Sequence, residues 1–254
     1  MAMAKKTKAT ELVIPKQKIL QFPVYIGGDI SVVHQFSEKA RGEIRDKQGH
    51  KAKGPKGARD PRSEYLCSKY IDAKTLYEGM PCAAVRRAII DAASFVEGIT
   101  KVQLRGAVFV LADGQNLDRL GIFHVRTTSG KPIFREDVVR LPTGGADLRY
   151  RSSFEQWGAK LTMQIDPDVF SPEQVHHLIE RAGFSIGLCE SRPQKSGEWG
   201  QFKIISEKEF SKMKPVRVSQ KDFEVVRAQM AQRNFGEGED NVVEAPAKRR
   251  RKAA

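Results

Sequence analysis

The chain has 254 residues, of which 40% are hydrophobic, and it carries a formal net charge of +13. It is long enough for one large domain or two small ones, with enough apolar residues to bury a core. No apolar run reaches membrane-spanning length and the N-terminus lacks a signal-peptide core, so we expect a cytoplasmic protein without a membrane partner.

Cysteine usage argues against a metal site. The chain has three cysteines, with no Cys-x-x-Cys spacing and no Cys/His cluster. A zinc site is therefore not expected, and neither is a disulfide framework, which fits a reducing cytosol. We expect no metal and no other cofactor.

Most of the positive charge lies in the part of the chain that we expect to fold. Of the thirteen excess charges, three lie in residues 1–10 and one in residues 234–254, which leaves nine on residues 11–233. A polyanion is the simplest partner for such a charge. The alternative is a basic protein whose charge serves solubility alone.

The first elements predicted along the chain are a strand over Ile19–Ile26 and a turn at Gly27–Asp29. They follow a basic leader, residues 1–10, whose polar composition predicts disorder. A helix is predicted over Gln35–Lys47, where apolar residues recur every four positions.

An insertion over Arg45–Arg62 contains seven cations, two acids and no large apolar residue. Because it cannot bury itself, we expect an exposed basic loop. One interpretation is an arm that folds over a nucleic acid, and the other is a solvated linker. We favour the arm, whose candidate phosphate-binding residues are Lys51, Lys53, Lys56, Arg59 and Arg62.

The helix predicted over Pro81–Val96 begins with a proline and small residues that permit close approach. The amides of a helix start attract phosphate, and Arg86 and Arg87 would add charge-assisted contacts. The alternative is an amphipathic helix whose arginines face water. Three strands are predicted next, over Lys101–Leu111, Gly121–Thr127 and Arg135–Leu141.

The second half of the chain begins near Tyr150. A strand is predicted over Ala159–Ile165. A helix is predicted over Ser171–Gly183, with Ser171 as the N-cap of a capping box that Gln174 completes. Pro172 occupies its first position, and Gly183 is the expected stop.

A glycine-punctuated loop follows, between strands predicted over Phe184–Cys189 and Gly200–Ile205. Arg192 and Lys195 offer donors to phosphate, and Trp199 offers a stacking face for a base. A final helix is predicted over Ser219–Arg233. The basic tail, residues 234–254, ends in the run Lys248–Lys252 and is expected to be disordered.

Strands that alternate with single helices predict an α+β fold, a ferredoxin-like or RRM-type antiparallel sheet with helices on one face. We divide the chain into a first half, residues 11–149 with the insertion 45–62, and a second half, residues 150–233.

Catalytic chemistry has little support in the sequence. No phosphate-binding loop, dinucleotide fingerprint, acidic metal cluster or nucleophile–base pair is present. His34 is the one candidate general acid or base for RNA cleavage, although a lone histidine at a strand end is more often a structural residue.

Three segments together resemble the RAMP superfamily of CRISPR RNA-binding proteins, in particular its effector backbone subunits. They are the early strand running into His34–Lys39, the proline–small–basic helix entry Gly79–Ala88, and the loop Gly187–Gly200. The chain also looks like uncharacterised phage-encoded proteins. The RAMP resemblance implies an RNA-recognition core, a basic arm over the guide and head-to-tail assembly on RNA. It also implies that Arg86 and Arg87 contact the RNA backbone and that Arg192 and Lys195 line the glycine loop.

The leading hypothesis is therefore a non-catalytic protein that binds single-stranded nucleic acid, RNA rather than DNA, within a ribonucleoprotein. Its partners would be the nucleic acid and other subunits or copies of itself. One alternative is a metal-independent endoribonuclease that uses His34. The other is a phage or host factor that binds a protein and no nucleic acid.

Overall fold

The structure is a computed structural model that describes residues 16–35, 41, 44, 48, 59–140 and 144–231. Its strands are β1 Leu20–Val33, β2 Tyr70–Ile71, β3 Glu78–Pro81, β4 Val108–Leu111, β5 Gly114–Gln115, β6 Gly121–Thr127, β7 Ile133–Arg140, β8 Ala146–Ile165, β9 Lys203–Ile204 and β10 Lys214–Pro215. Its helices are α2 Pro61–Cys67, α3 Cys82–Ala92, α4 Lys101–Ala107, α5 Pro172–Ser185, α6 Glu207–Ser211 and α7 Gln220–Ala231, with 3₁₀ turns η1 Ala93–Phe95 and η2 Pro193–Lys195.

The strands form an antiparallel sheet in the order β2-β3-β6-β8-β1-β9. Along the chain, helix α3 comes between strands β1 and β6, and helix α5 comes between strands β8 and β9. The spatial order β9-β1-β8-β6 is the split β-α-β arrangement of a ferredoxin-like sheet. The predicted α+β fold with an antiparallel sheet is therefore confirmed.

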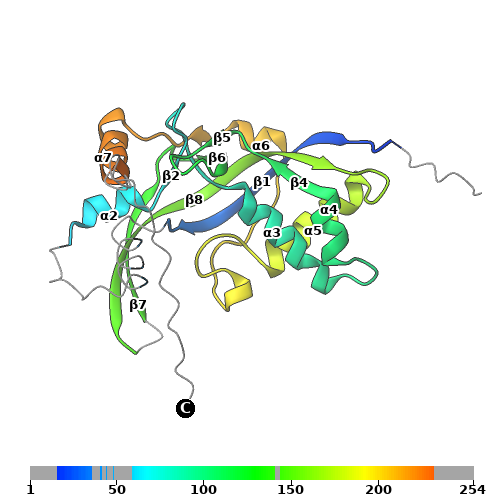
Figure 1. The fold of residues 1–254 in the computed structure, drawn as a ribbon, viewed down its shortest axis with the longest axis horizontal. Coiled ribbons are helices and arrows are strands. Elements are labelled where there is room, and N and C mark those ends of the chain that lie inside the picture. The colour runs from blue at the N-terminus through cyan, green and yellow to red at the C-terminus, as the bar shows by residue number, and fades with distance from the viewer. Residues whose placement is uncertain are drawn as a thin grey trace, which may run out of the picture.

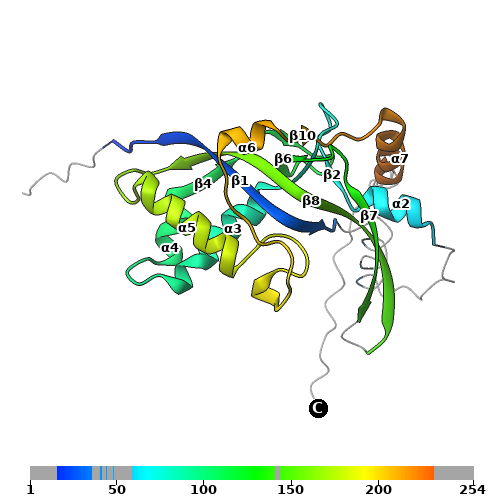
Figure 2. The same ribbon diagram turned by 180° about the vertical axis from the view of Figure 1, so that it is seen from behind.

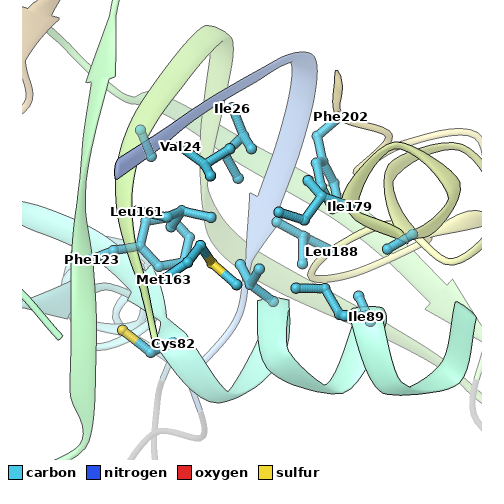
Figure 3. Close-up of a cluster of buried hydrophobic side chains, with 14 of the residues drawn as sticks. Val24, Ile26, Cys82, Ile89, Phe123, Leu161, Met163, Ile179, Leu188 and Phe202 are labelled. Carbon is cyan, nitrogen blue, oxygen red and sulfur yellow. The ribbon is translucent and has the colours of Figure 1, made fainter. Parts of the chain in front are cut away.

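The main core lies between this sheet and the helices α3 and α5. Figure 3 shows Val24 and Ile26 from β1 and Leu161 from β8 facing Ile89 of α3 and Ile179 of α5. These side chains are almost fully buried. The alternation of buried residues along β1 and β8 directs one face of the sheet to the helices, as the pleat requires.

Strand β8 extends beyond the core to form a hairpin with β7. Its residues Ala146–Ser153 pair with β7, while Ser152–Ile165 pair with β1. Figures 1 and 2 show this β7–β8 hairpin projecting from the sheet. The boundary between the two predicted halves of the chain, at residues 149 and 150, lies inside β8.

A second, smaller core joins α2 and α7 at the base of the hairpin. Leu66 of α2 packs with Phe223 and Val226 of α7 and with the preceding Val218. Figure 1 shows these two helices at the end of the molecule away from α5. The predicted helix over Ser219–Arg233 is confirmed as α7 within the described residues.

Local signals predicted several elements correctly. Ser171 caps α5 in a capping box with Gln174, and Pro172 is its first residue. The strand over Gly121–Thr127 has the bounds of β6. The helix over Pro81–Val96 is observed as α3 followed by η1. The predicted helix over 35–47 falls mostly outside the described residues.

The strand predicted over Lys101–Leu111 is wrong in its first part. Residues Lys101–Ala107 form α4, and only Val108–Leu111 form a strand. Thr100 is the reason, because its side chain accepts from the amide of Gln103 while the Gln103 side chain accepts from the amide of Thr100. This capping box satisfies the free donors of a helix start and overrides the strand pattern.

The turn predicted at Gly27–Asp29 is also wrong, because β1 continues through these residues. The glycines serve close packing instead. A Cβ on Gly27 would lie 2.8 Å from the carbonyl oxygen of Trp157, and a Cβ on Gly28 would overlap that of Gln201. Glycine is needed here for backbone approach.

The strand predicted over Phe184–Cys189 is not formed. Helix α5 continues to Ser185, so Gly183 lies inside it and is not its stop. Gly187, with a φ of +72°, follows the end of the helix, and its amide donates to the carbonyl of Ala182. Of the second predicted strand, Gly200–Ile205, only Lys203–Ile204 form a strand.

We predict opposite effects for the same substitution at two helical glycines. A Cβ on Gly183 would overlap the carbonyl oxygen of Phe202, whereas Gly106 of α4 has open space around it. Gly183→Ala should lower the free energy of unfolding by about 2 kcal/mol. Gly106→Ala should raise it by about 0.5 kcal/mol through helix propensity. Urea titrations measure both changes, and a stable Gly183→Ala protein would contradict the packing described.

Candidate nucleic-acid interface

The carboxylate of Asp91 joins helix α3 to the glycine loop, residues Gly187–Gly200. It accepts hydrogen bonds from Arg87 Nε at 3.0 Å, Lys101 Nζ at 3.3 Å and Gln194 Nε2 at 3.1 Å. The Asp91 side chain is 8% exposed, whereas that of Arg87 is 72% exposed. Burial raises the pKa of Asp91, but the hydrogen bonds from Arg87, Gln194 and Lys101 outweigh it and hold that pKa below its usual range.

Gln194 extends this network to Arg192. The side-chain oxygen of Gln194 accepts from Arg192 Nε at 3.2 Å and from Nη2 at 3.1 Å, while Arg192 Nη1 donates to the carbonyl of Cys189. The structure therefore connects two predicted sites, Arg87 at the helix entry and Arg192 in the loop, through Asp91 and Gln194. Lys195 is exposed and ends the η2 turn beside Gln194.

The glycine loop is fixed by its backbone. The amide of Leu188 donates to the carbonyl of Gly200, which closes the loop at its base. The amides of Glu190 and Gly200 donate to the carbonyls of Val32 and Ile30 in β1. The loop backbone, which carries Arg192 and Lys195, is thus anchored to the end of β1.

Trp199 lies at the junction of the loop and the β7–β8 hairpin. The Arg135 guanidinium lies over its indole, 4.3 Å from the ring centroid, which is within cation–π range. Arg135 also donates to Asp137 at 3.0 Å. The predicted stacking residue therefore has an arginine of β7 on one of its faces.

A buried arginine on β8 adds to this junction. Arg151 donates to Asp137 at 2.7 Å, and its Nη1 lies 3.8 Å from Glu190 of the loop. Burial raises the pKa of Asp137, but the hydrogen bonds from Arg135 and Arg151 outweigh burial. The pKa is therefore below its usual range, and the carboxylate stays charged. The hairpin thus presents positioned arginines to the loop.

His34 follows the end of β1, in the field of the same charged groups. Burial and the nearby Arg149 lower the pKa of its imidazole, and Glu190 opposes them. The neutral form is favoured near neutral pH. A neutral imidazole has the lone pair that a general base requires.

Arg86 points to a different partner from its neighbour Arg87. It donates to the carbonyl of Val108 at 3.0 Å and to that of Arg105 at 2.7 Å, and it lies over the Phe109 ring. These bonds satisfy carbonyls at the end of α4. The structure therefore places Arg86 at the α4–β4 junction and not in the Asp91 network.

Arg59 and Arg62 are both held by carboxylates outside the Asp91 network. Arg59 forms ion pairs with Glu64 at 2.6 Å and Asp147 at 2.7 Å, and Arg62 pairs with Asp222 at 2.8 Å. The remaining predicted arm residues, Lys51, Lys53 and Lys56, fall outside the described residues.

Sequence reasoning missed the hairpin arginines Arg135, Arg149 and Arg151. Their signal was the alternation along the strands, since Arg149 and Arg151 are two apart and share one face of β8. In the register, Arg135 lies opposite Arg151, and Asp137 lies opposite Arg149. Asp91 and Lys101 were missed because their roles depend on tertiary contacts: Asp91 accepts from Gln194 of the loop, and Lys101 donates to Asp91.

No cluster of three or more His, Cys, Asp or Glu side chains among the described residues is arranged to hold a metal ion. Among the described helices, none combines the length and apolar character needed to cross a bilayer.

Comparisons with known proteins give structural likenesses but no sequence relative. No protein-family model matches the chain, and no curated protein matches it. Among solved structures, the chain is similar to Cmr6 from Pyrococcus furiosus with 12% identity and a TM-score of 0.32. The match covers 75% of this chain and 100% of that one. Agreement at this level does not establish a common fold, so the RAMP resemblance stays a prediction.

We predict that Asp91→Asn lowers the free energy of unfolding by about 1–2 kcal/mol at neutral pH. The pKa of Asp91 is lowered in the folded state, so its contribution is present above the unfolded value of about 4. It is lost as the pH falls through the folded value. The difference in free energy of unfolding between wild type and Asp91→Asn should therefore become smaller below about pH 4.

Urea titrations across pH measure this difference. Asp168→Asn is the matched control, because Asp168 is exposed and lies 3.8 Å from Lys18. It should change the free energy of unfolding little. If Asp91→Asn lowers the free energy of unfolding by the same amount at neutral and acidic pH, the Asp91 carboxylate is not the stabilising group.

Proposed function

We propose that this protein binds single-stranded nucleic acid, RNA in preference to DNA, without cleaving it. The binding surface comprises the glycine loop, the nearby side chains of Arg87 and Lys101, and one face of the β7–β8 hairpin. The arginines of that face are Arg135, Arg149 and Arg151. The observation that carries the proposal is the network from Arg87 through Asp91 and Gln194 to Arg192, which gathers cations from distant segments.

The network leaves donors for phosphate. Arg87 uses its Nε to bond Asp91, and its two terminal nitrogens have no acceptor among the described residues. Lys195 likewise has no carboxylate partner in this part of the chain. Asp91 holds the Arg87 fork in one orientation before a ligand arrives, which lowers the entropic cost of binding. Charge-assisted bonds to phosphate oxygens would follow.

The junction of Trp199 and Arg135 supports recognition of a strand whose bases are unpaired. An indole and a guanidinium plane both offer surfaces on which a base stacks, and stacking is possible only where the base is free of its duplex. The proposed partner is therefore single-stranded. We further propose that the protein acts as one subunit of a ribonucleoprotein, as the RAMP resemblance suggests.

We predict that affinity for a single-stranded RNA oligonucleotide falls steeply as salt rises, because binding releases counterions from phosphates. Each phosphate neutralised on a single strand contributes ~0.7 to the slope of log affinity against log salt, so Arg87→Ala with Arg192→Ala should reduce that slope by about 1.4. Fluorescence anisotropy across a salt series measures the slope. The control is Arg227→Ala on α7, which lies away from the loop (Figures 1 and 2). Salt-insensitive or undetectable binding by the wild type would refute the proposal.

The second candidate function is RNA cleavage by His34, which the position of its neutral imidazole beside Arg149 and Glu190 favours. Under our proposal, RNA incubated with the protein and EDTA stays intact on a denaturing gel. Metal-independent cleavage that is lost in His34→Ala would establish the enzyme instead. His177→Ala, on α5, is the matched control.

A further inference from the structure

A pocket of about 540 Å³ lies on the opposite face of the β7–β8 hairpin from the glycine loop. Tyr65 of α2, Phe134 of β7 and Val218 before α7 contribute to its walls. Its volume is in the range of small-molecule sites in proteins. The residues of the proposed RNA-binding surface do not line it.

Two of the residues that line the pocket, Lys69 and Glu78, form a buried ion pair. Lys69 Nζ lies 2.6 Å from Glu78 Oε1, and their side chains are 4% and 1% exposed. The second Glu78 oxygen accepts from Ser152 at 3.4 Å. Burial raises the pKa of Glu78, and Lys69 opposes that rise. The pocket wall therefore holds an ammonium group and a carboxylate in fixed positions.

The mouth of the pocket has an excess of positive charge. Arg62, Lys131 and Arg217 line it with a single further acid, Asp222, which is already paired with Arg62 at 2.8 Å. Among the described residues, neither Lys131 nor Arg217 has a carboxylate within ion-pair distance. Both are exposed. This part of the pocket is therefore suited to an anion.

The wall carries a half-exposed aromatic ring. The Phe134 ring centroid lies 5.0 Å from that of Tyr65 and 5.8 Å from that of Tyr150, and Phe134 is 48% exposed. Lys69 Nζ lies over the Tyr65 ring at 4.4 Å, so Phe134 is the more available of the two. A planar aromatic group would stack on it.

We propose that this pocket binds a nucleotide. The base stacks on Phe134 with its polar edge toward Lys69 and Glu78, and the phosphate binds Lys131 and Arg217. An aromatic wall, a fixed donor–acceptor pair and an unpaired cationic mouth are the three elements that such a ligand requires. The proposal does not depend on the RNA-binding surface, because the two sites use different faces of the hairpin.

Calorimetric titration of the full-length protein with adenosine and uridine 5′-monophosphates tests the proposal. We expect saturable 1:1 binding, weakened roughly tenfold by Phe134→Ala through loss of stacking. Arg217→Ala should weaken it to a similar extent and should leave binding of the uncharged nucleoside unchanged. Val138→Ala is the control, because Val138 is 71% exposed on the same strand and does not line the pocket.

Absence of binding by the wild type to both nucleotides would overturn the proposal. So would binding that both variants retain at full strength while their circular dichroism spectra match the wild type. Competition with a 5′-phosphorylated oligonucleotide and its 5′-hydroxyl counterpart assigns the source of the nucleotide. Displacement by the first alone identifies a strand end, and displacement by neither identifies a free nucleotide. The RNA anisotropy assay reads out the other site, so failure of one proposal is distinguishable from failure of the other.

Discussion

The antiparallel pairing of β1 with β8 is the constraint on which the positions of the candidate site residues depend. The carbonyls of Ile30 and Val32 in β1 hold the amides of Gly200 and Glu190, and therefore hold the glycine loop. The other strand, β8, continues into the hairpin that carries Arg149 and Arg151. Because the side-chain period of a strand is two, a slip of one residue would turn these arginines away from the loop. Close packing opposes such a slip. Gly27 lies against the carbonyl oxygen of Trp157 and Gly28 lies against its buried indole, and a residue with a Cβ would not fit at either position.

Elements of the fold can be predicted from the sequence where the residues that determine them are close together along the chain. The start of α5 is encoded by Ser171, Pro172 and Gln174, which are adjacent in sequence, and it was predicted correctly. The capping box of Thr100 is equally local, but the β-branched composition of the segment that follows it favours a strand and conceals α4. Gly27 and Gly183 could not be interpreted from neighbouring residues. Each is set by a backbone that is distant in sequence, at Trp157 and at Phe202.

The same distinction applies to the candidate site. Arg87, Arg192 and Trp199 could be selected from the sequence because a cation or an aromatic beside glycine and proline is a local pattern. The groups that position them could not, since the hydrogen bond from Gln194 to Asp91 joins residues 103 apart. Arg86 illustrates the limit, because adjacent arginines on one helix have unrelated partners, and only the position of the α4–β4 junction separates them.

The acids inside this basic surface have a physical role that net charge alone would hide. Asp91 and Asp137 are each bonded to two cationic side chains, and each has a lowered pKa. They reduce the long-range attraction for a polyanion, but they hold the guanidinium groups in place. Affinity would then come from pre-organised contacts more than from the overall field. The pocket beside Phe134 follows the same principle, since Glu78 fixes Lys69 and Asp222 fixes Arg62, which leaves Lys131 and Arg217 for the proposed nucleotide. The hairpin is the wall between the two sites, so the register of β7 with β8 determines which side chains each site receives.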